Sequence, residues 1–388
     1  MSYKAGRHFL QLPGPTNTPE RVLRAMSKPT IDHRGPEFQE LTHRVLDGLA
    51  KVFKTEHTVV VYPASGSGAW EATLANTLSP GDRVVSFRQG FFAGKWADVA
   101  RSFGVEVEVQ PWDLRRGVAA EAVMDVLSQD GDGSVKAVLM VHNETSTGVT
   151  TDIEAIGRAM RESGHPAMLF VDAVSSLAAT DLRHDEWGLD VTLTGSQKGL
   201  MLPPGLAMVA VSPRAMEASR ASEIPVSYWS WSDHLELNAR GFFPYTPATH
   251  LLYGLDEALR MLEEEGLDSV FARHRRFARA TRVAVDAWGL ENFAAEEAES
   301  SAAATAVLVP EGQDADALRE TILERFDMSL GTGLGEVKGK VFRIGHLGDL
   351  NELMLAGTLA GVEMGLRLAG VPHQTGGVQA AMELLCEA

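Results

Sequence analysis

The chain has 388 residues, of which 45% are hydrophobic and 22% charged, a composition typical of a globular protein with a large buried core. Its formal net charge of −17 argues against nucleic-acid and anionic-membrane partners, because phosphate groups would be repelled. The one cysteine, Cys386, excludes a disulfide within the chain, and no apolar signal segment stands in the first residues, so a cytoplasmic location is expected.

Short apolar segments alternate with helical patterns through the first half of the chain. The expected strands are residues 58–62, 84–87, 105–109, 137–142, 168–172, 191–194 and 206–211. Strands that alternate with helices indicate βαβ units and a mainly parallel sheet with helices on both faces. We therefore predict an α/β fold with a large seven-stranded sheet.

The pattern changes after Pro213. Residues 228–247 are rich in aromatic side chains and are expected to form loops, and long helices follow at 251–265 and 267–288. The predicted elements beyond them are strand, helix, strand and helix at 303–309, 315–326, 341–344 and 350–368. This order suits a smaller α+β domain. The expected division is an N-terminal arm (1–18), a large α/β domain (19–265) and a small α+β domain (266–388).

Two residues at predicted strand ends suggest a shared site. Lys198 follows the strand at 191–194 in a Ser/Gly-rich turn, where partial desolvation would lower the pKa of its amine and make it a nucleophile. Asp172 ends the strand at 168–172, at the edge where open α/β sheets bind ligands. Asp172 alone is as often a cap or turn residue, and a lysine such as Lys198 alone is more often solvated. The pair, however, suits pyridoxal phosphate, which needs a lysine for its aldehyde and an acid for its ring nitrogen.

Further motifs fit a small phosphorylated ring. The Ser/Gly-rich turn at 64–68 opens a helix, whose N–H groups can approach an anion, and it lacks the features of a P-loop or a dinucleotide fingerprint. Phe92 offers a face for ring stacking, or simply core packing. Arg343 can bind a carboxylate with two hydrogen bonds from its planar guanidinium, or it can lie on the surface of a strand. Glycines at 331, 333 and 335 predict a flexible segment that leads to this strand.

These motifs and their order along the chain resemble those of the class V aminotransferases, a family of fold type I pyridoxal phosphate enzymes. The resemblance is strongest to the alanine/serine-glyoxylate aminotransferase branch. The resemblance spans nearly the whole chain. The matching motifs are PGPTNTP (13–19), SGSG (65–68), HNETSTG (142–148), VDAVSS (171–176), GSQKG (195–199), PPG (203–205) and GKVFRIG (339–345).

The resemblance implies that Lys198 carries the cofactor, that Asp172 faces the ring nitrogen and that Arg343 binds the substrate carboxylate. The other implied cofactor contacts are Ser65, Gly66, Ser67 and Gln197 at the phosphate, Thr145 at the ring edge, Phe92 on the ring face and Thr246 at the phosphate of the neighbouring subunit. A homodimer with active sites at the subunit interface follows, and no metal is expected. Phe243 replaces a tyrosine that is usual in the family, so Tyr245 is expected to supply the second phosphate hydroxyl unless that contact is lost.

The implied activity is the transfer of an amino group from a small L-amino acid to glyoxylate, giving glycine and a 2-oxo acid by a ping-pong Schiff-base mechanism. Serine is the expected donor, and the alternatives are aspartate or alanine with glyoxylate, or serine with pyruvate. The donor pocket has four candidate residues, each as readily a packing residue: His33, Arg34, Trp229 and Trp231. A pyridoxal phosphate lyase, a silent cofactor-binding protein and an NAD-dependent dehydrogenase are weaker alternatives.

Overall fold

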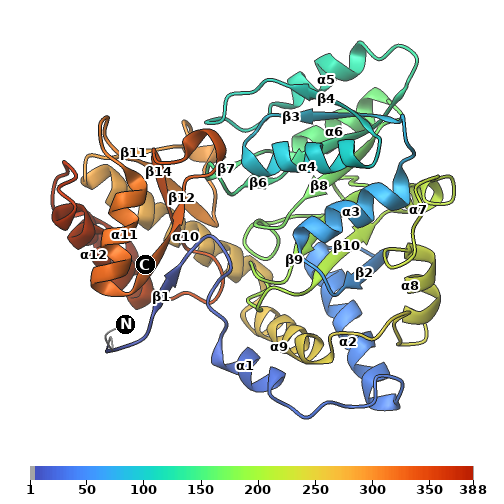
Figure 1. Ribbon diagram of the computed structural model, residues 1–388, viewed down its shortest axis with the longest axis horizontal. Coiled ribbons are helices and arrows are strands. Elements are labelled where there is room, and N and C mark those ends of the chain that lie inside the picture. Colours follow the sequence, from blue (N-terminus) through green and yellow to red (C-terminus); the bar gives the residue numbers. More distant parts are fainter. Residues whose placement is uncertain (1–4, 388) are drawn as a thin grey trace.

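Two sheets of different size form two lobes of the computed structural model, which describes residues 5–387 (Figure 1). Residues 1–4 of the predicted arm and the last residue of the predicted small domain lie outside the described part. Within residues 5–387, none of the helices combines the length and the hydropathy that a membrane crossing requires. The site described below lies between the large sheet and the N-terminal arm.

The large lobe contains a seven-stranded sheet in the order β2-β10-β9-β8-β5-β3-β4. Its strands are β2 (Thr58–Tyr62), β3 (Arg83–Phe87), β4 (Glu106–Gln110), β5 (Val135–Val141), β8 (Met168–Asp172), β9 (Val191–Gly195) and β10 (Ala207–Val211). Only β10, between β2 and β9, runs antiparallel to its neighbours in this sheet. The predicted large, mainly parallel sheet is therefore confirmed, and each predicted strand overlaps an observed one.

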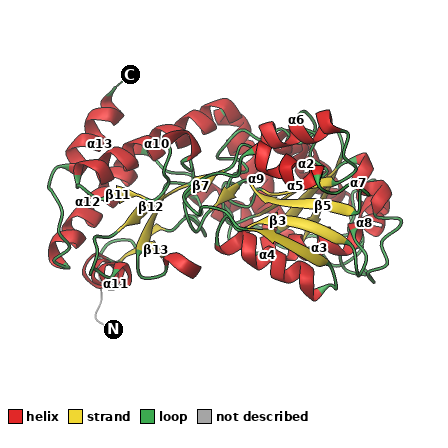
Figure 2. Cartoon of the chain, turned by 90° about the horizontal axis from the view of Figure 1, so that it is seen from above, coloured by secondary structure: helices red, strands yellow, loops and turns green. Residues whose placement is uncertain are grey.

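Helices cover both faces of the large sheet, as Figure 2 shows. One face packs against α2 (Pro36–Phe53), α5 (Ala120–Ser128), α6 (Ile153–Ser163) and α9 (Thr249–Glu265). The other face packs against α3 (Gly66–Thr77), α4 (Phe91–Ser102), α7 (Pro213–Ala218) and α8 (Trp231–Asn238). Because both faces are buried, the inner strands are almost continuously apolar, and a polar side chain at a strand end stands out.

The smaller lobe contains a five-stranded sheet in the order β1-β13-β14-β12-β11. Its strands are β1 (Phe9–Gln11), β11 (Glu291–Asn292), β12 (Ala304–Leu308), β13 (Met328–Thr332) and β14 (Val341–Gly345). The helices of its core are α10 (Leu267–Ala287), α11 (Ala315–Phe326), α12 (Glu352–Leu368) and α13 (Gly377–Cys386). Strand β1 pairs in parallel with β13, so the arm supplies the edge of this sheet before it reaches α1 (Glu20–Met26) (Figure 1).

The structure corrects two expectations. The aromatic stretch expected to be loop contains the short helix α8, which begins where Ser230 accepts a hydrogen bond from the backbone N–H of Asp233. Gly331 was expected in a flexible segment that leads to the strand of Arg343, but it lies in β13 and pairs with Arg343 of β14. Both elements depend on long-range contacts: Trp231 of α8 is buried in the core beside the large sheet, and β13 pairs with β1 and β14.

The remaining short elements are β6 (Asn143–Glu144), β7 (Val149–Thr150) and the 3₁₀ turns η1 (Glu297–Glu299) and η2 (Gly335–Val337). Strands β6 and β7 form a separate antiparallel ladder beyond the end of β5. For the chain division, we propose residue 266 as the start of the small domain, because Gly266 separates α9 from α10.

Candidate active site

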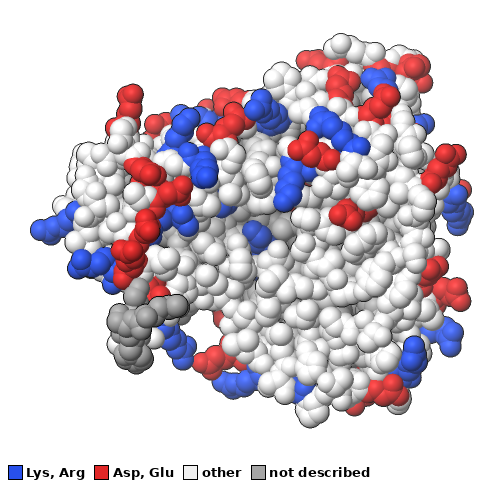
Figure 3. Space-filling view, in the orientation of Figure 1, with Lys and Arg blue, Asp and Glu red and all other residues white. Residues whose placement is uncertain are grey.

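A cavity of about 220 Å³ opens at the carboxyl ends of β5, β8 and β9, beneath the N-terminal arm. Figure 3 shows a basic group in the hollow between the two lobes. Most other charged side chains on this face lie toward the outline of the molecule. The cavity is lined by Gly14, Pro15, Ser65, Gly66, Ser67, Trp70, Phe92, Val141, Asn143, Thr145, Asp172, Val174, Gln197 and Lys198. Eight predicted site residues therefore meet at one cavity, and Arg343 and Thr246 lie outside this lining.

Lys198 reaches the cavity from the turn after β9, and its side chain is buried. Its Nζ atom donates a 2.7 Å hydrogen bond to the carbonyl oxygen of Pro13, and the N–H of Thr16 donates to the carbonyl of Gln197, so the arm lies across this turn. The pKa of the Lys198 amine is lowered to about 8, chiefly by burial, although Asp172 raises it. A larger fraction of this amine is therefore uncharged at neutral pH than of an exposed lysine.

Asp172 is the last residue of β8 and lies buried at the base of the cavity. Its Oδ1 accepts a 2.8 Å hydrogen bond from the N–H of Val174, and its Oδ2 accepts one of 2.8 Å from the indole N–H of Trp70. Burial raises the pKa of Asp172 to about 6, and these hydrogen bonds oppose that rise. The carboxyl group is therefore mostly ionised at pH 7, with both oxygens held by N–H groups.

Sequence reasoning assigned no role to Trp70. A usable signal was present, because Trp70 stands four residues after Gly66 in the same predicted helix. Residues four apart lie on one face of a helix, so Trp70 had to face the same side as the phosphate-binding turn.

The start of α3 forms one wall of the cavity. Ser65 precedes the helix in an extended conformation and makes no side-chain capping bond. The first N–H groups of a helix have no intrahelical partner and lie at the positive end of its dipole, so they suit an anion. The backbone is tightly packed here, because a Cβ atom at Gly66 would lie 2.5 Å from Cγ2 of Val174.

Glu144 is a second residue that sequence reasoning left without a role. Its Oε2 accepts hydrogen bonds of 3.1 Å from the N–H groups of Phe92 and Ala93, and its Oε1 accepts from the N–H and hydroxyl of Ser146. This buried carboxylate therefore caps the start of α4 and fixes the backbone that carries Phe92. The neighbouring Thr145 donates its hydroxyl to Ser175 at 2.7 Å, which sets its side chain beside the cavity.

Arg343 comes to the site from the small sheet. Its Nε donates to the carbonyl of Thr332 and its Nη1 to the carbonyl of Thr145, both at 2.8 Å, and the side chain is buried. Burial lowers the pKa of Arg343 to about 10, so it keeps its charge at neutral pH. Glycine at position 331 gives this side chain room, because a Cβ there would lie 2.9 Å from Cβ of Arg343.

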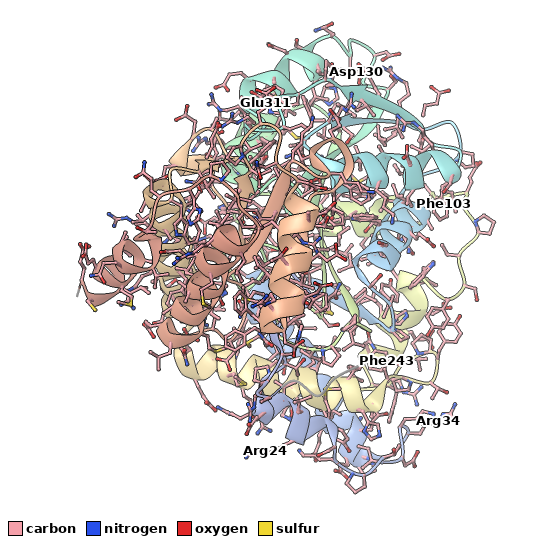
Figure 4. The ribbon with its side chains drawn as sticks, turned by 60° about the vertical axis from the view of Figure 1, so that its left-hand side comes forward. Arg24, Arg34, Phe103, Asp130, Phe243 and Glu311 are labelled. Carbon is pink, nitrogen blue, oxygen red and sulfur yellow. The ribbon has the colours of Figure 1, made fainter. Side chains whose placement is uncertain are left out.

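Thr246 is exposed on the loop after α8 and is not among the residues that line the cavity of its own chain. Phe243 of the same loop packs edge-on against Phe38 of α2, with ring centroids 6.0 Å apart. The Tyr245 hydroxyl lies 3.0 Å from that of Ser227. The donor-pocket candidates His33, Arg34, Trp229 and Trp231 are all absent from the described lining, and Figure 4 shows Arg34 at the outer edge of the molecule.

A family model for class V aminotransferases matches residues 8–334. The chain belongs to the class V aminotransferases. This class V aminotransferase is 48% identical over 99% of its length to a serine–glyoxylate aminotransferase of Arabidopsis thaliana, covering 96% of that protein. It is 46% identical over 96% of its length to an L-aspartate–glyoxylate aminotransferase of Paracoccus denitrificans, covering 94% of that protein. The crystal structure of pyridoxamine-pyruvate aminotransferase from Mesorhizobium loti superposes with a TM-score of 0.93 at 30% identity, covering 99% of each chain.

These findings confirm the resemblance, the fold type I architecture and a pyridoxal phosphate-dependent aminotransferase. The residues present fit that cofactor. The cavity offers an amine at Lys198, an ionised acid at Asp172 and the anion-binding start of α3. In addition, Oε1 of Gln197 is buried and has no hydrogen-bond partner in the described chain, so a bound polar group would satisfy that amide.

Proposed function

We propose that this aminotransferase moves the amino group of L-serine to glyoxylate, giving glycine and a 2-oxo acid in two half-reactions. The acceptor is supported by the names of the two relatives compared above, which both act on glyoxylate. The donor is supported by the cations at the cavity: Lys198 is the one basic residue in its described lining, and Arg343 reaches the lining residue Thr145 from the small sheet. With Arg343 as the partner of the α-carboxylate, a second carboxylate such as that of aspartate would need another cation. A short neutral side chain needs none.

The proposed roles follow from the contacts of each residue. Pyridoxal phosphate, when bound, supplies a ring that withdraws electrons from the substrate Cα and a carbon that carries the amino group. Asp172 holds a proton on the ring nitrogen, and Lys198 carries the cofactor at rest and then moves a proton at the substrate Cα. Arg343 binds the substrate carboxylate with the Nη2 group that makes no hydrogen bond within the described chain.

The remaining residues are proposed to bind and orient the cofactor. The N–H groups at the start of α3 hold the phosphate, Phe92 covers one ring face, and Thr145 contacts the ring edge. The proposed phosphate contacts within the chain are Ser65, Gly66, Ser67 and Gln197, all at the cavity wall. We also propose a cytoplasmic location, in keeping with a single cysteine and no disulfide within the chain.

The donor is tested by single-turnover half-reactions of the purified holoenzyme with L-serine, L-alanine and L-aspartate, followed by the loss of cofactor colour. We expect L-serine to react fastest and to yield its 2-oxo acid. The aminated enzyme should then be reoxidised faster by glyoxylate than by pyruvate. If L-aspartate reacted fastest, the donor assignment would be wrong. If no amino acid discharged the colour, the aminotransferase proposal for this cavity would fail as a whole.

We further propose a homodimer in which Thr246 reaches the cofactor phosphate of the neighbouring subunit. The support is its position, since Thr246 is exposed and does not line the cavity of its own chain. The Tyr228 ring nearby is partly exposed and stacks on Tyr245, with centroids 4.5 Å apart. An aromatic, partly exposed loop of this kind is typical of a protein interface.

Subunit mixing tests the shared site. Lys198→Ala and Thr246→Asp homodimers should both be inactive, the second because a carboxylate would repel the phosphate. If Thr246 acts in the partner's site, a mixed dimer regains one intact site, built from Lys198 of one chain and Thr246 of the other. We expect mixed dimers to recover about half of the wild-type activity per dimer, because one site in two is whole. Recovery would be absent if Thr246 served its own chain.

A further inference from the structure

The indole of Trp70 links the phosphate-binding helix to the acid at the base of the cavity. Trp70 lies in the second turn of α3, is almost fully buried and lines the cavity. Its Nε1 donates a 2.8 Å hydrogen bond to Oδ2 of Asp172. The same short helix therefore presents N–H groups toward the proposed phosphate site at its start and a side-chain N–H to the acid one turn later.

This hydrogen bond orients the carboxylate. Oδ1 of Asp172 is held by the N–H of Val174, and Oδ2 is held by the Trp70 indole, so rotation of the carboxylate would break at least one bond. A carboxylate oxygen can accept two hydrogen bonds, so each oxygen of Asp172 can still accept one more. Both existing donors favour the ionised carboxylate, which is the form that can face a protonated ring nitrogen.

A neighbouring tryptophan provides an internal comparison. Trp96 of α4 stacks on Trp70, with ring centroids 6.1 Å apart and planes inclined by 14°. Trp96 is also fully buried, but its indole Nε1 has no hydrogen-bond partner in the described chain. The two indoles thus share their packing and burial, and only one of them contacts Asp172.

We propose that Trp70 is a positioning residue for the transamination, which aims the Asp172 carboxylate at the cofactor ring nitrogen and keeps it ionised. This inference rests on the proposed function of the cavity. It assigns to the indole N–H a specific task that packing alone would not require. The groups whose charges also act on Asp172 are Glu144 and Lys198, and neither donates a hydrogen bond to it.

The test compares Trp70→Phe with Trp96→Phe, since each removes one indole N–H and leaves an aromatic ring in the stack. Equilibrium affinity is measured for pyridoxal phosphate and for its analogue with carbon in place of the ring nitrogen. We expect Trp70→Phe to weaken pyridoxal phosphate binding by about tenfold or more, the effect of one hydrogen bond to a charged group. Binding of the carbon analogue should be unchanged. Trp96→Phe should alter both affinities equally or not at all.

The pH dependence of turnover is a second readout. Without the indole donor, the ionised Asp172 is less favoured, so the acidic limb of the kcat profile should move to higher pH in Trp70→Phe and stay in place in Trp96→Phe. Trp70→His, which keeps a ring N–H, should restore part of the affinity. It also serves as the working variant if Trp70→Phe does not fold.

The proposal is overturned if Trp70→Phe and Trp96→Phe lose the same affinity for both ligands, or if the pH profile of Trp70→Phe matches that of the wild type. These outcomes differ from a failure of the proposed function. If the cavity were not the cofactor site, the wild-type protein would bind pyridoxal phosphate no better than a Lys198→Ala variant, whatever residue stood at position 70.

Discussion

Lys198→Ala should reduce the turnover of transamination by at least on the order of 10² to 10⁴-fold, the loss expected for a general base alone. The physical reason is the burial of this amine at the cavity, which lowers its pKa to about 8 and leaves a usable uncharged fraction near neutral pH. No other amine lies in the described lining, so no second lysine there can take over the role of Lys198. Activity is measured with L-serine and glyoxylate under saturating cofactor.

The covalent part of the prediction has its own measurement. Reduction of the holoenzyme with borohydride and peptide mass spectrometry should place the cofactor on the peptide that contains Lys198. Lys54→Ala is the matched control, because Lys54 is a half-buried lysine whose Nζ pairs with Asp181, away from the cavity lining. This control should keep its turnover. Full activity of Lys198→Ala, or a cofactor adduct at another lysine, would contradict the central assignment.

Asp172→Asn should reduce kcat by roughly one to three orders of magnitude while the protein still binds pyridoxal phosphate. An opposite charge at hydrogen-bonding distance shifts a pKa by about 1–3 units, so its removal leaves the ring nitrogen largely unprotonated and the carbanion poorly stabilised. Binding should persist because the start of α3 and Lys198 remain in place. Turnover and cofactor content are measured on the same preparations.

Asp190→Asn is the control for Asp172→Asn. Asp190 is also buried at the large sheet, but its carboxylate accepts hydrogen bonds from Leu169 and Arg214 rather than lining the cavity. Asp190→Asn should lower the thermal midpoint of unfolding and leave the turnover of the folded fraction close to that of the wild type. If Asp172→Asn behaved in the same way, with lost stability and intact turnover, the acid would be structural and its proposed role would be wrong.

Much of the large sheet could be predicted from local patterns. Its inner strands are mostly apolar because helices cover both faces, so β8 and β10 appear in the sequence as apolar runs, while β9 alternates apolar residues with buried threonines. The polar residues that end such runs, Asp172 among them, stand out for the same reason. Sheet strands that end at the same edge bring those residues together, which is why Lys198 and Asp172 could be paired before any coordinates.

The local patterns were less informative where an element depends on distant partners. Strand β13 contains the glycine at 331, which by propensity suggests a loop, and it forms by pairing with β1 and β14. The residue at 331 is glycine because Arg343 and the arm residue Pro13 leave no room for a side chain there. Helix α8 is short, and its buried Trp231 packs against residues far away in the chain. Such elements are set by tertiary contacts that no local window contains.

By itself, the sequence determined which residues end the apolar strands, and thereby the amine, the acid and the phosphate-binding turn. Only the tertiary structure decided how those groups are held: the indole of Trp70 on Asp172, the carboxylate of Glu144 beneath Phe92, and the carbonyl of Pro13 on the Lys198 amine. The physical reason is that strand ends follow from a local hydrophobic pattern, whereas each of these hydrogen bonds joins groups that are distant in the chain. Such bonds exist only once the core has packed.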